Sequence, residues 1–465
     1  MTAIHPETQS VAQAAAAEAQ RDASVAPGQY LAPPRSVLDE IGDALGASEV
    51  SEPAWLAARR GGAMDRFAVT GFPGPRDEEW RFTPITPISQ GTFVTPLPAE
   101  VLSERISPYL FGHEEWTRLV FVDGRFSAEL SSLGALPDGL SVGNLPEAVA
   151  RQGALLEQHL AHHAPVDGSP FTALNTALFG DGAFVHVRAG ADLSQPVHLL
   201  YLTTGETPDA AAHPRTLLLV DRGARASVVE SYVGLGEARS FTNAVTEVAV
   251  AEGAWVEHAR LQRETEQAFH IGRTQVNQQR DSHYRSFVLQ MGGAISRHDL
   301  HCRLNAPNVE TLMYGLYLAH GEQLVDNHTA IYHDHPGCRS WEVYKGVLDD
   351  RAHAVFNGKV FVTPEAQKTD AKQTNRNLLL SRESRVDTKP QLEIFADDVK
   401  CTHGATVGFL DKLALFYAQS RGIDAVSAQK LLTYAFAAEV VQEVAIGPVR
   451  DELDRLVLER VGHLG

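Results

Sequence analysis

The sequence predicts a mainly β protein with a β-solenoid at its centre and helical regions at both ends. The centre, residues 169–408, is a succession of short β-rich segments separated by Gly, Asn and Asp turns, with no helical pattern between them. Such segments are typical of a sandwich, a barrel or a solenoid. We favour the solenoid, in which each coil buries its apolar face by stacking on the next, because a single Asn-Gly hairpin signal, Asn357-Gly358, occurs among them.

The region before residue 169 has a different pattern. Residues 1–35 contain few large apolar side chains, and we expect them to form a mobile tail. Between residues 36 and 168 apolar side chains recur at helical spacing, at 37–45, 55–67 and 146–163. We therefore expect a mainly helical N-terminal domain over 36–168, with short strands near residues 118–122.

The last 57 residues, 409–465, are also predicted to be helical. Apolar residues from Leu431 to Val441 recur at helical spacing, and those from Leu453 to Val461 do so again. Gly447-Pro448 separates these two amphipathic segments. A wide apolar stripe at a chain end either folds back on the core or awaits a partner, and the pattern alone leaves both readings open.

Composition excludes several classes of protein. Lys and Arg number 40 against 58 Asp and Glu, which gives a net charge of −18 and argues against a nucleic-acid partner. Three widely spaced cysteines make no disulfide framework and fit a reducing compartment. The N-terminus lacks the basic and apolar regions of a signal peptide, and no run of about 18 apolar residues occurs. We expect a cytoplasmic protein without a membrane span.

Residues able to bind a metal lie in the second half of the chain. His333 and His335, with Cys338 nearby, form one group, and Cys401 and His403 form another. Residues two apart on a strand face the same side, so each pair would present two ligands together. Sulfur and nitrogen ligands suit Zn, Fe and Fe–S chemistry. A complete set of four ligands is absent, so a metal would be held by an incomplete, shared or transient site.

Structural explanations compete with these candidates. A His-x-His pair without a third ligand is more often structural, and an isolated cysteine such as Cys302 is more often a small buried hydrophobe. The sequence contains no phosphate-binding Walker A loop, no Gly-x-Ser-x-Gly and no His-Glu-x-x-His. The acidic pairs Asp349-Asp350 and Asp397-Asp398 leave a polysaccharide-cleaving β-helix as a remote alternative, because such pairs are usually solvated turn residues.

One segment is specific enough to indicate a family. Residues 388–408 read TKPQLEIFADDVKCTHGATVG and resemble the C-terminal signature of the SufD members of the SufB/SufD family, which belong to the SUF system of iron–sulfur cluster assembly. The resemblance covers most of residues 36–445 and is densest from 326 to 423. Matching motifs occur in the family's order: EEWRFT at 78–83, YKGV at 344–347, VFNGK at 355–359, AQKTDA at 366–371, LFY at 415–417 and SRGI at 420–423.

The resemblance implies both the fold and the role. It implies a right-handed parallel β-helix core at 169–408, and a scaffold subunit, not an enzyme, that pairs with SufB through the β-helix. It also implies that the ATPase SufC docks on the helical domain 409–465, and it leaves open a homodimer of the isolated chain. Iron or a nascent cluster would be bound transiently and shared with SufB, with no permanent cofactor. The expected partner-binding residues are Leu415, Phe416, Tyr417, Arg421, Gly422, Leu431 and Phe436.

The resemblance also assigns roles to individual residues. His403 matches the family's functionally required histidine, and Cys401 matches the neighbouring family cysteine. SufB-type chains carry a sulfur-accepting cysteine in the stretch that corresponds to residues 373–381, and this chain has none there. A self-sufficient, SufB-like scaffold is therefore the less favoured alternative. Whether a reduced flavin contacts this subunit stays open.

Overall fold

The computed structural model describes residues 30–31 and 52–462, so most of the expected tail 1–35 and the helical pattern at 37–45 lie outside the described residues. The chain divides into two compact units. One comprises the residues up to Thr92 together with Ala164–Leu178, and the other comprises Phe93–His163 and Phe179–Gly465. Among the described residues, no helix is long and apolar enough to cross a membrane.

The first unit is a small helical assembly around an aromatic core. α3 (Ala54–Thr70) packs against α7 (Pro170–Leu178), and β1 (Tyr30–Leu31) pairs antiparallel with β2 (Phe72–Pro73). Two short helices, η1 (Glu78–Trp80) and α4 (Thr86–Ser89), follow β2. The ring centroids of Trp80 and Phe171 lie 5.1 Å apart. The tryptophan of the EEWRFT motif is thus part of this core.

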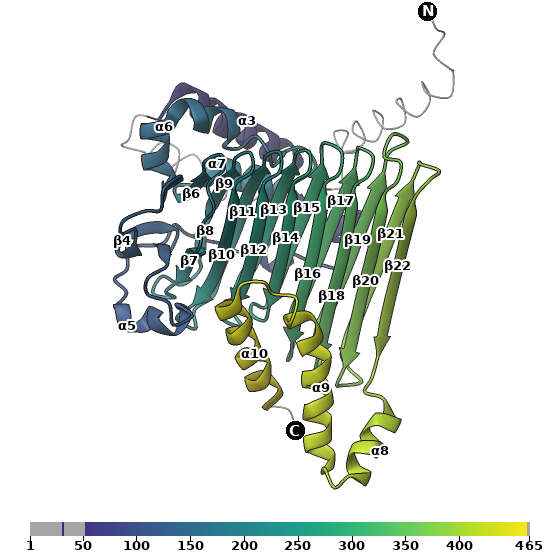
Figure 1. The fold of residues 1–465 in the computed structure, drawn as a ribbon. Coiled ribbons are helices and arrows are strands. Elements are labelled where there is room, and N and C mark those ends of the chain that lie inside the picture. The colour runs from purple at the N-terminus through teal and green to yellow at the C-terminus, as the bar shows by residue number, and fades with distance from the viewer. Residues whose placement is uncertain (1–29, 32–51, 463–465) are drawn as a thin grey trace, which may run out of the picture. The chain divides into compact units, whose positions relative to one another are not determined.

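The second unit is a β-solenoid of about eight turns, which confirms the predicted fold class. Successive strands alternate between two sheets of ten strands each, and the coils stack in parallel (Figure 1). The strands of the solenoid are β6 (Gly182–Val187), β7 (Val197–Thr203), β8 (Ala210–Ala212), β9 (Arg215–Val220), β10 (Arg225–Gly234), β11 (Ser240–Val250), β12 (Trp255–Arg263), β13 (Phe269–Gln278), β14 (His283–Gln290), β15 (Ile295–Leu304), β16 (Glu310–Ala319), β17 (Leu324–His333), β18 (Arg339–Leu348), β19 (His353–Val362), β20 (Asp370–Leu379), β21 (Arg385–Ile394) and β22 (Lys400–Gly408).

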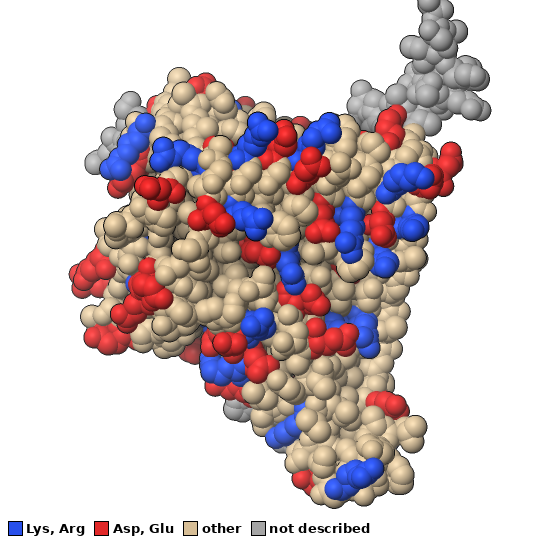
Figure 2. Space-filling model, in the orientation of Figure 1, with Lys and Arg blue, Asp and Glu red and all other residues tan. Residues whose placement is uncertain are grey.

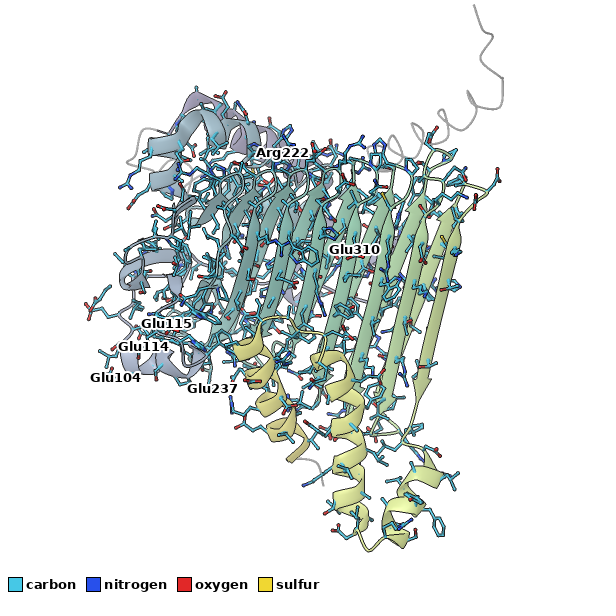
Figure 3. The ribbon with its side chains drawn as sticks, viewed as in Figure 1. Glu104, Glu114, Glu115, Arg222, Glu237 and Glu310 are labelled. Carbon is cyan, nitrogen blue, oxygen red and sulfur yellow. The ribbon has the colours of Figure 1, made fainter. Side chains whose placement is uncertain are left out.

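Alternation along each strand explains the stacking. In β19, Ala354, Phe356, Val360 and Val362 point into the solenoid and are at most 1% exposed. Outward side chains form ion pairs from coil to coil instead. Glu310, which Figure 3 labels on the face of β16, contacts Arg339 at 3.2 Å on the next strand. This alternation determines the register of neighbouring strands, because a slip of one residue would turn the inward side chains outward and the outward ones inward.

The two ends of the solenoid differ. At the first end β3 (Thr117–Val122) continues one sheet and β4 (Arg125–Ser132) closes it antiparallel, while β5 (Leu140–Asn144) closes the other on β6. The helices of this part are α5 (Ser103–Ile106), η2 (Ser107–Tyr109) and α6 (Leu145–His159). We expected residues 93–163 inside a mainly helical domain with short strands near residues 118–122. β3 lies at that position, and β4 and β5 are further strands that this region contributes to the sheets. The predicted domain boundaries at 35, 168 and 408 stay predictions.

At the other end no antiparallel strand from the described residues closes the sheets. β21 and β22 are the terminal strands, and within the described chain each pairs on one side only, with β19 and β20 respectively. Their outer edges therefore present backbone N–H and C=O groups that no neighbouring strand of the described chain uses. Stacked repeats need a cap or a partner at such an end.

Three helices follow β22: α8 (Lys412–Ser420), α9 (Ala425–Val441) and α10 (Gly447–Gly462). α9 and α10 lie against the outer face of the sheet that contains β14, β16 and β18 (Figure 1). Val440, Val441 and Leu453 join Phe287 and Leu316 in one buried cluster. The apolar stripe of the last two helices therefore folds back on the core, which was one of the two readings of the sequence.

A buried lysine attaches α9 to the sheet. Lys345 Nζ, whose side chain is 1% exposed, donates to the Phe436 carbonyl at 2.9 Å and to Glu439 Oε2 at 2.6 Å. Lys345→Met is expected to destabilise the docked helix by about 1–3 kcal/mol, since the charged hydrogen bonds to Glu439 and to the Phe436 carbonyl are lost. Hydrogen exchange over residues 425–441 measures this. Arg376→Met, which removes a more exposed partner of Glu439, is the control; equal exchange in both variants would contradict the prediction.

Candidate functional site at the open end of the solenoid

Cys401 and His403 lie side by side on the terminal strand. In the register of β20 with β22, Ala371 pairs with Cys401 and Gln373 pairs with His403. Ala371 and Gln373 are each 1% exposed and line the interior of the solenoid. Cys401 and His403 therefore continue two inward-facing columns at the point where the solenoid stops.

The surroundings of the two side chains differ. Cys401 is partly buried against a small apolar cluster that includes Val362 and Ala371, whereas His403 is exposed. Burial raises the pKa of the Cys401 thiol, and a hydrogen bond with the backbone of Ala371 acts in the opposite direction. The thiol is thus protonated at neutral pH in the isolated chain, and a metal ion would have to displace this proton.

The chain supplies too few ligands here for a closed metal site. In the part of the chain that the structure describes, no group of three or more His, Cys, Asp or Glu side chains is arranged to hold a metal ion. One thiol and one imidazole on the terminal strand of a sheet would leave the remaining coordination positions to a partner or to solvent. Such an arrangement suits the transfer of a metal better than its storage.

The other predicted metal group does not form a strand-face pair. β17 ends at His333, and His335 lies in the turn that follows. His333 points inward, is fully buried, and its Nε2 lies 2.9 Å from Ser340 Oγ; burial lowers its pKa to about 3. Cys338 Sγ donates to the Ala306 carbonyl at 3.3 Å. The assumption of one extended strand through residues 333–335 was therefore wrong, and a metal-binding role for these three residues is not tested.

Cys302 has the structural role that the sequence analysis favoured. It is fully buried, its Sγ lies 3.8 Å from Met313 Sδ, and burial raises the pKa of its thiol. A protonated thiol that is enclosed by apolar side chains behaves as a small hydrophobic residue.

A second candidate surface lies on α8 and the start of α9. We call it the α8–α9 surface. Figure 2 shows mostly uncharged atoms where α8 lies, with few charges of either sign. Its large apolar members are 50–72% exposed: Leu413, Phe416, Tyr417, Val426 and Leu431. Monomeric proteins seldom expose apolar groups of this size next to one another, so the surface is of the kind that binds another protein.

The predicted partner-binding residues fall into two sets. Phe416, Tyr417, Arg421, Gly422 and Leu431 are exposed. Leu415 and Phe436 are half-buried, and the Phe436 ring lies 4.5 Å from Lys345 Nζ, on the side of α9 that faces the sheet. Sequence reasoning missed Leu413 and Val426. Leu413 was detectable, because it lies three and four residues before Phe416 and Tyr417 on the same helical face.

Known proteins resemble the chain over nearly its whole length. Residues 201–436 match the SufBD core domain of SUF system FeS cluster assembly, and residues 46–199 match the N-terminal region of SufBD proteins. An iron–sulfur cluster assembly SufBD family protein of Synechocystis is 34% identical over 416 residues, which are 88% of this chain and 91% of the relative. The chain belongs to the SufBD family. The iron–sulfur cluster assembly protein SufD of Escherichia coli is 33% identical over 86% of this chain and 91% of the relative, and SufD of Bacillus subtilis is 27% identical over 88% and 95%.

Membership in this family gives the open end its context. The chain is a homologue of SufD proteins and belongs to a family of iron–sulfur cluster assembly. The family implies that iron or an iron–sulfur cluster is involved in the function of its members. The match of the core domain, 201–436, includes β22, α8 and the part of α9 that carries Leu431.

Proposed function

We propose that this chain is the SufD-type scaffold subunit of a SUF complex. It pairs with a SufB-type chain through the open end of its solenoid and docks a SufC-type ATPase on the α8–α9 surface. His403, with Cys401, supplies ligands for iron or the nascent cluster at the shared interface. One observation carries the proposal: a thiol and an imidazole share the inward face of a strand whose outer edge meets no other strand of the described chain.

The open end favours a partner that is itself a solenoid. The outer edges of β21 and β22 present parallel rows of backbone donors and acceptors, which a strand from another chain can extend. Inward-facing side chains of these strands, such as Leu392 and Cys401, are only partly buried in the isolated chain. A second solenoid stacked end to end would bury them and place its own side chains beside His403.

The α8–α9 surface favours a separate partner. It lies on α8 and the start of α9, and beside its exposed apolar residues stands Arg421, whose guanidinium lies 5.2 Å from the centroid of the Tyr417 ring. Aromatic residues with an arginine are the side chains that most often dominate the binding energy of an interface. A SufC-type ATPase that is bound here leaves the open end free for the SufB-type chain.

The ligand role predicts an iron deficit in one variant. The chain is coexpressed with SufB and SufC, and iron and sulfide are measured in the purified complex. His403→Ala is expected to leave the complex intact and to lower its affinity for iron by at least about 10-fold, the lower end of what loss of a supporting residue costs a metal site.

His335→Ala is the matched control, a partly exposed histidine in the turn after β17. Unchanged iron in His403→Ala would remove His403 from the proposal, and an iron deficit in His335→Ala would move the site to that turn. A chain that retains neither SufB nor SufC at micromolar concentration would overturn the scaffold proposal. An intact cluster on the chain alone would favour the self-sufficient, SufB-like reading.

A further inference from the structure

A polar column leads from His403 into the solenoid. Glu342 on β18, Gln373 on β20 and His403 on β22 occupy the same register position on three neighbouring strands. Glu342 and Gln373 are each 1% exposed, and His403 is exposed at the open end. A buried carboxyl and a buried amide thus stand directly behind the candidate iron ligand.

The amide of Gln373 has one orientation in the structure. Its Nε2 donates to Glu342 Oε2 at 2.8 Å, and while Glu342 is ionised the reverse orientation would place two oxygens against each other. On the opposite sheet, a Cβ on Gly358 would lie 2.2 Å from Gln373 Nε2, so the glycine makes room for the amide. Gln373 is therefore held between the two sheets, with the carboxyl of Glu342 on one side and the backbone of Gly358 on the other.

The remaining atom of this amide lacks a partner. Gln373 Oε1 is buried, and within the described chain no hydrogen-bond donor reaches it. Leaving a buried carbonyl without a donor costs about 1–3 kcal/mol, so the position favours a donor. The next side chain in the column is the imidazole of His403. Neighbouring strands lie about 4.8 Å apart, which puts the imidazole within reach by a change of rotamer.

We propose that Gln373 is a positioning residue for His403: its Oε1 accepts a hydrogen bond from one ring N–H and leaves the other ring nitrogen free for the metal, while Glu342 anchors the amide. The part that concerns iron rests on the proposed function of His403. A ring N–H that is held in this way selects one tautomer and one ring orientation, as acceptors behind metal-binding histidines generally do.

The test compares removal of the acceptor with its restoration. Gln373→Leu removes Oε1. The double variant Glu342→Gln/Gln373→Glu exchanges the two groups, so that residue 342 donates its amide N–H and residue 373 again offers an oxygen to His403. Gln391→Leu, a partly buried glutamine on β21, is the control. Each variant is coexpressed with SufB and SufC, and iron binding and the imidazole resonances of His403, assigned with His403→Ala, are measured in the assembled protein.

We expect Gln373→Leu to weaken iron binding by about 10- to 100-fold and to convert one His403 tautomer into a mixture, and the exchanged pair to restore both. Unchanged imidazole resonances in Gln373→Leu, or an exchanged pair no better than Gln373→Leu, would overturn the positioning role. The measurements distinguish the iron-binding role of His403 from its hydrogen bond with Gln373. If His403→Ala leaves iron unchanged while Gln373→Leu still shifts the His403 resonances, the iron role fails and the hydrogen bond stands.

Discussion

Phe416→Asp is expected to weaken binding of a SufC-type ATPase by about 30- to 700-fold, which corresponds to the roughly 2–4 kcal/mol that a dominant interface residue contributes. Phe416 is 67% exposed in the middle of the α8–α9 surface, so a charge there costs the folded chain little. In the complex the carboxylate would be buried against apolar side chains without a partner, which is unfavourable. Calorimetric titration with the purified ATPase measures the loss.

The matched control is Leu102→Asp. Leu102 is 70% exposed, lies just before α5, and is remote in sequence from the α8–α9 surface. Both variants should melt at the temperature of the wild type, while only Phe416→Asp loses the ATPase. Equal loss in the two variants would indicate a general effect of the added charge, and no loss in either would place the ATPase on another surface.

The local sequence pattern and the family resemblance were sufficient to predict the solenoid. They were also sufficient to predict that Cys401 and His403 lie on the same face of one strand. Both residues lie within one strand, and a spacing of two determines their common face without knowledge of any other part of the chain. The pairing of strands that are distant in sequence was not predictable in the same way. β3 and β5 belong to the sheets only because β7 and β6 lie beside them, and a short strand in a helix-rich stretch carries no signal of a distant partner.

The error at His335 had a local cause that the sequence does show. Pro336-Gly337 follows directly, Gly337 has a φ of 73°, and this turn ends the strand at His333.

The proposed role of Gln373 was harder to predict from the sequence. β18 places Glu342 inward and Lys345 outward, yet both are buried and both lie among apolar residues. Polarity alone therefore does not tell the inner face of this strand from the outer one.

Glu342→Gln is expected to make the protein more stable above pH 7, with the difference from the wild type disappearing towards pH 4.5. Burial raises the pKa of Glu342 to about 7, with the hydrogen bond from Gln373 acting in the opposite direction. The folded state therefore binds one proton more than the unfolded chain between about pH 4.5 and 7. Stability falls as the pH rises through this window, by about 3 kcal/mol in all.

Glutamine has the shape of the protonated carboxyl and keeps an oxygen to accept from Gln373 Nε2, so it removes this pH dependence without opening a cavity. Denaturant unfolding of both proteins between pH 4.5 and 8.5 gives the comparison. Glu310→Gln, which removes a carboxyl from the outer face of β16, controls for the loss of one negative charge. A constant difference across the pH range would contradict the prediction, because it would mean that Glu342 keeps the same charge in both states throughout. A difference that grows with pH in Glu342→Gln alone would show that the solenoid holds a neutral carboxyl behind Gln373 at low pH and carries the cost of its charge at high pH.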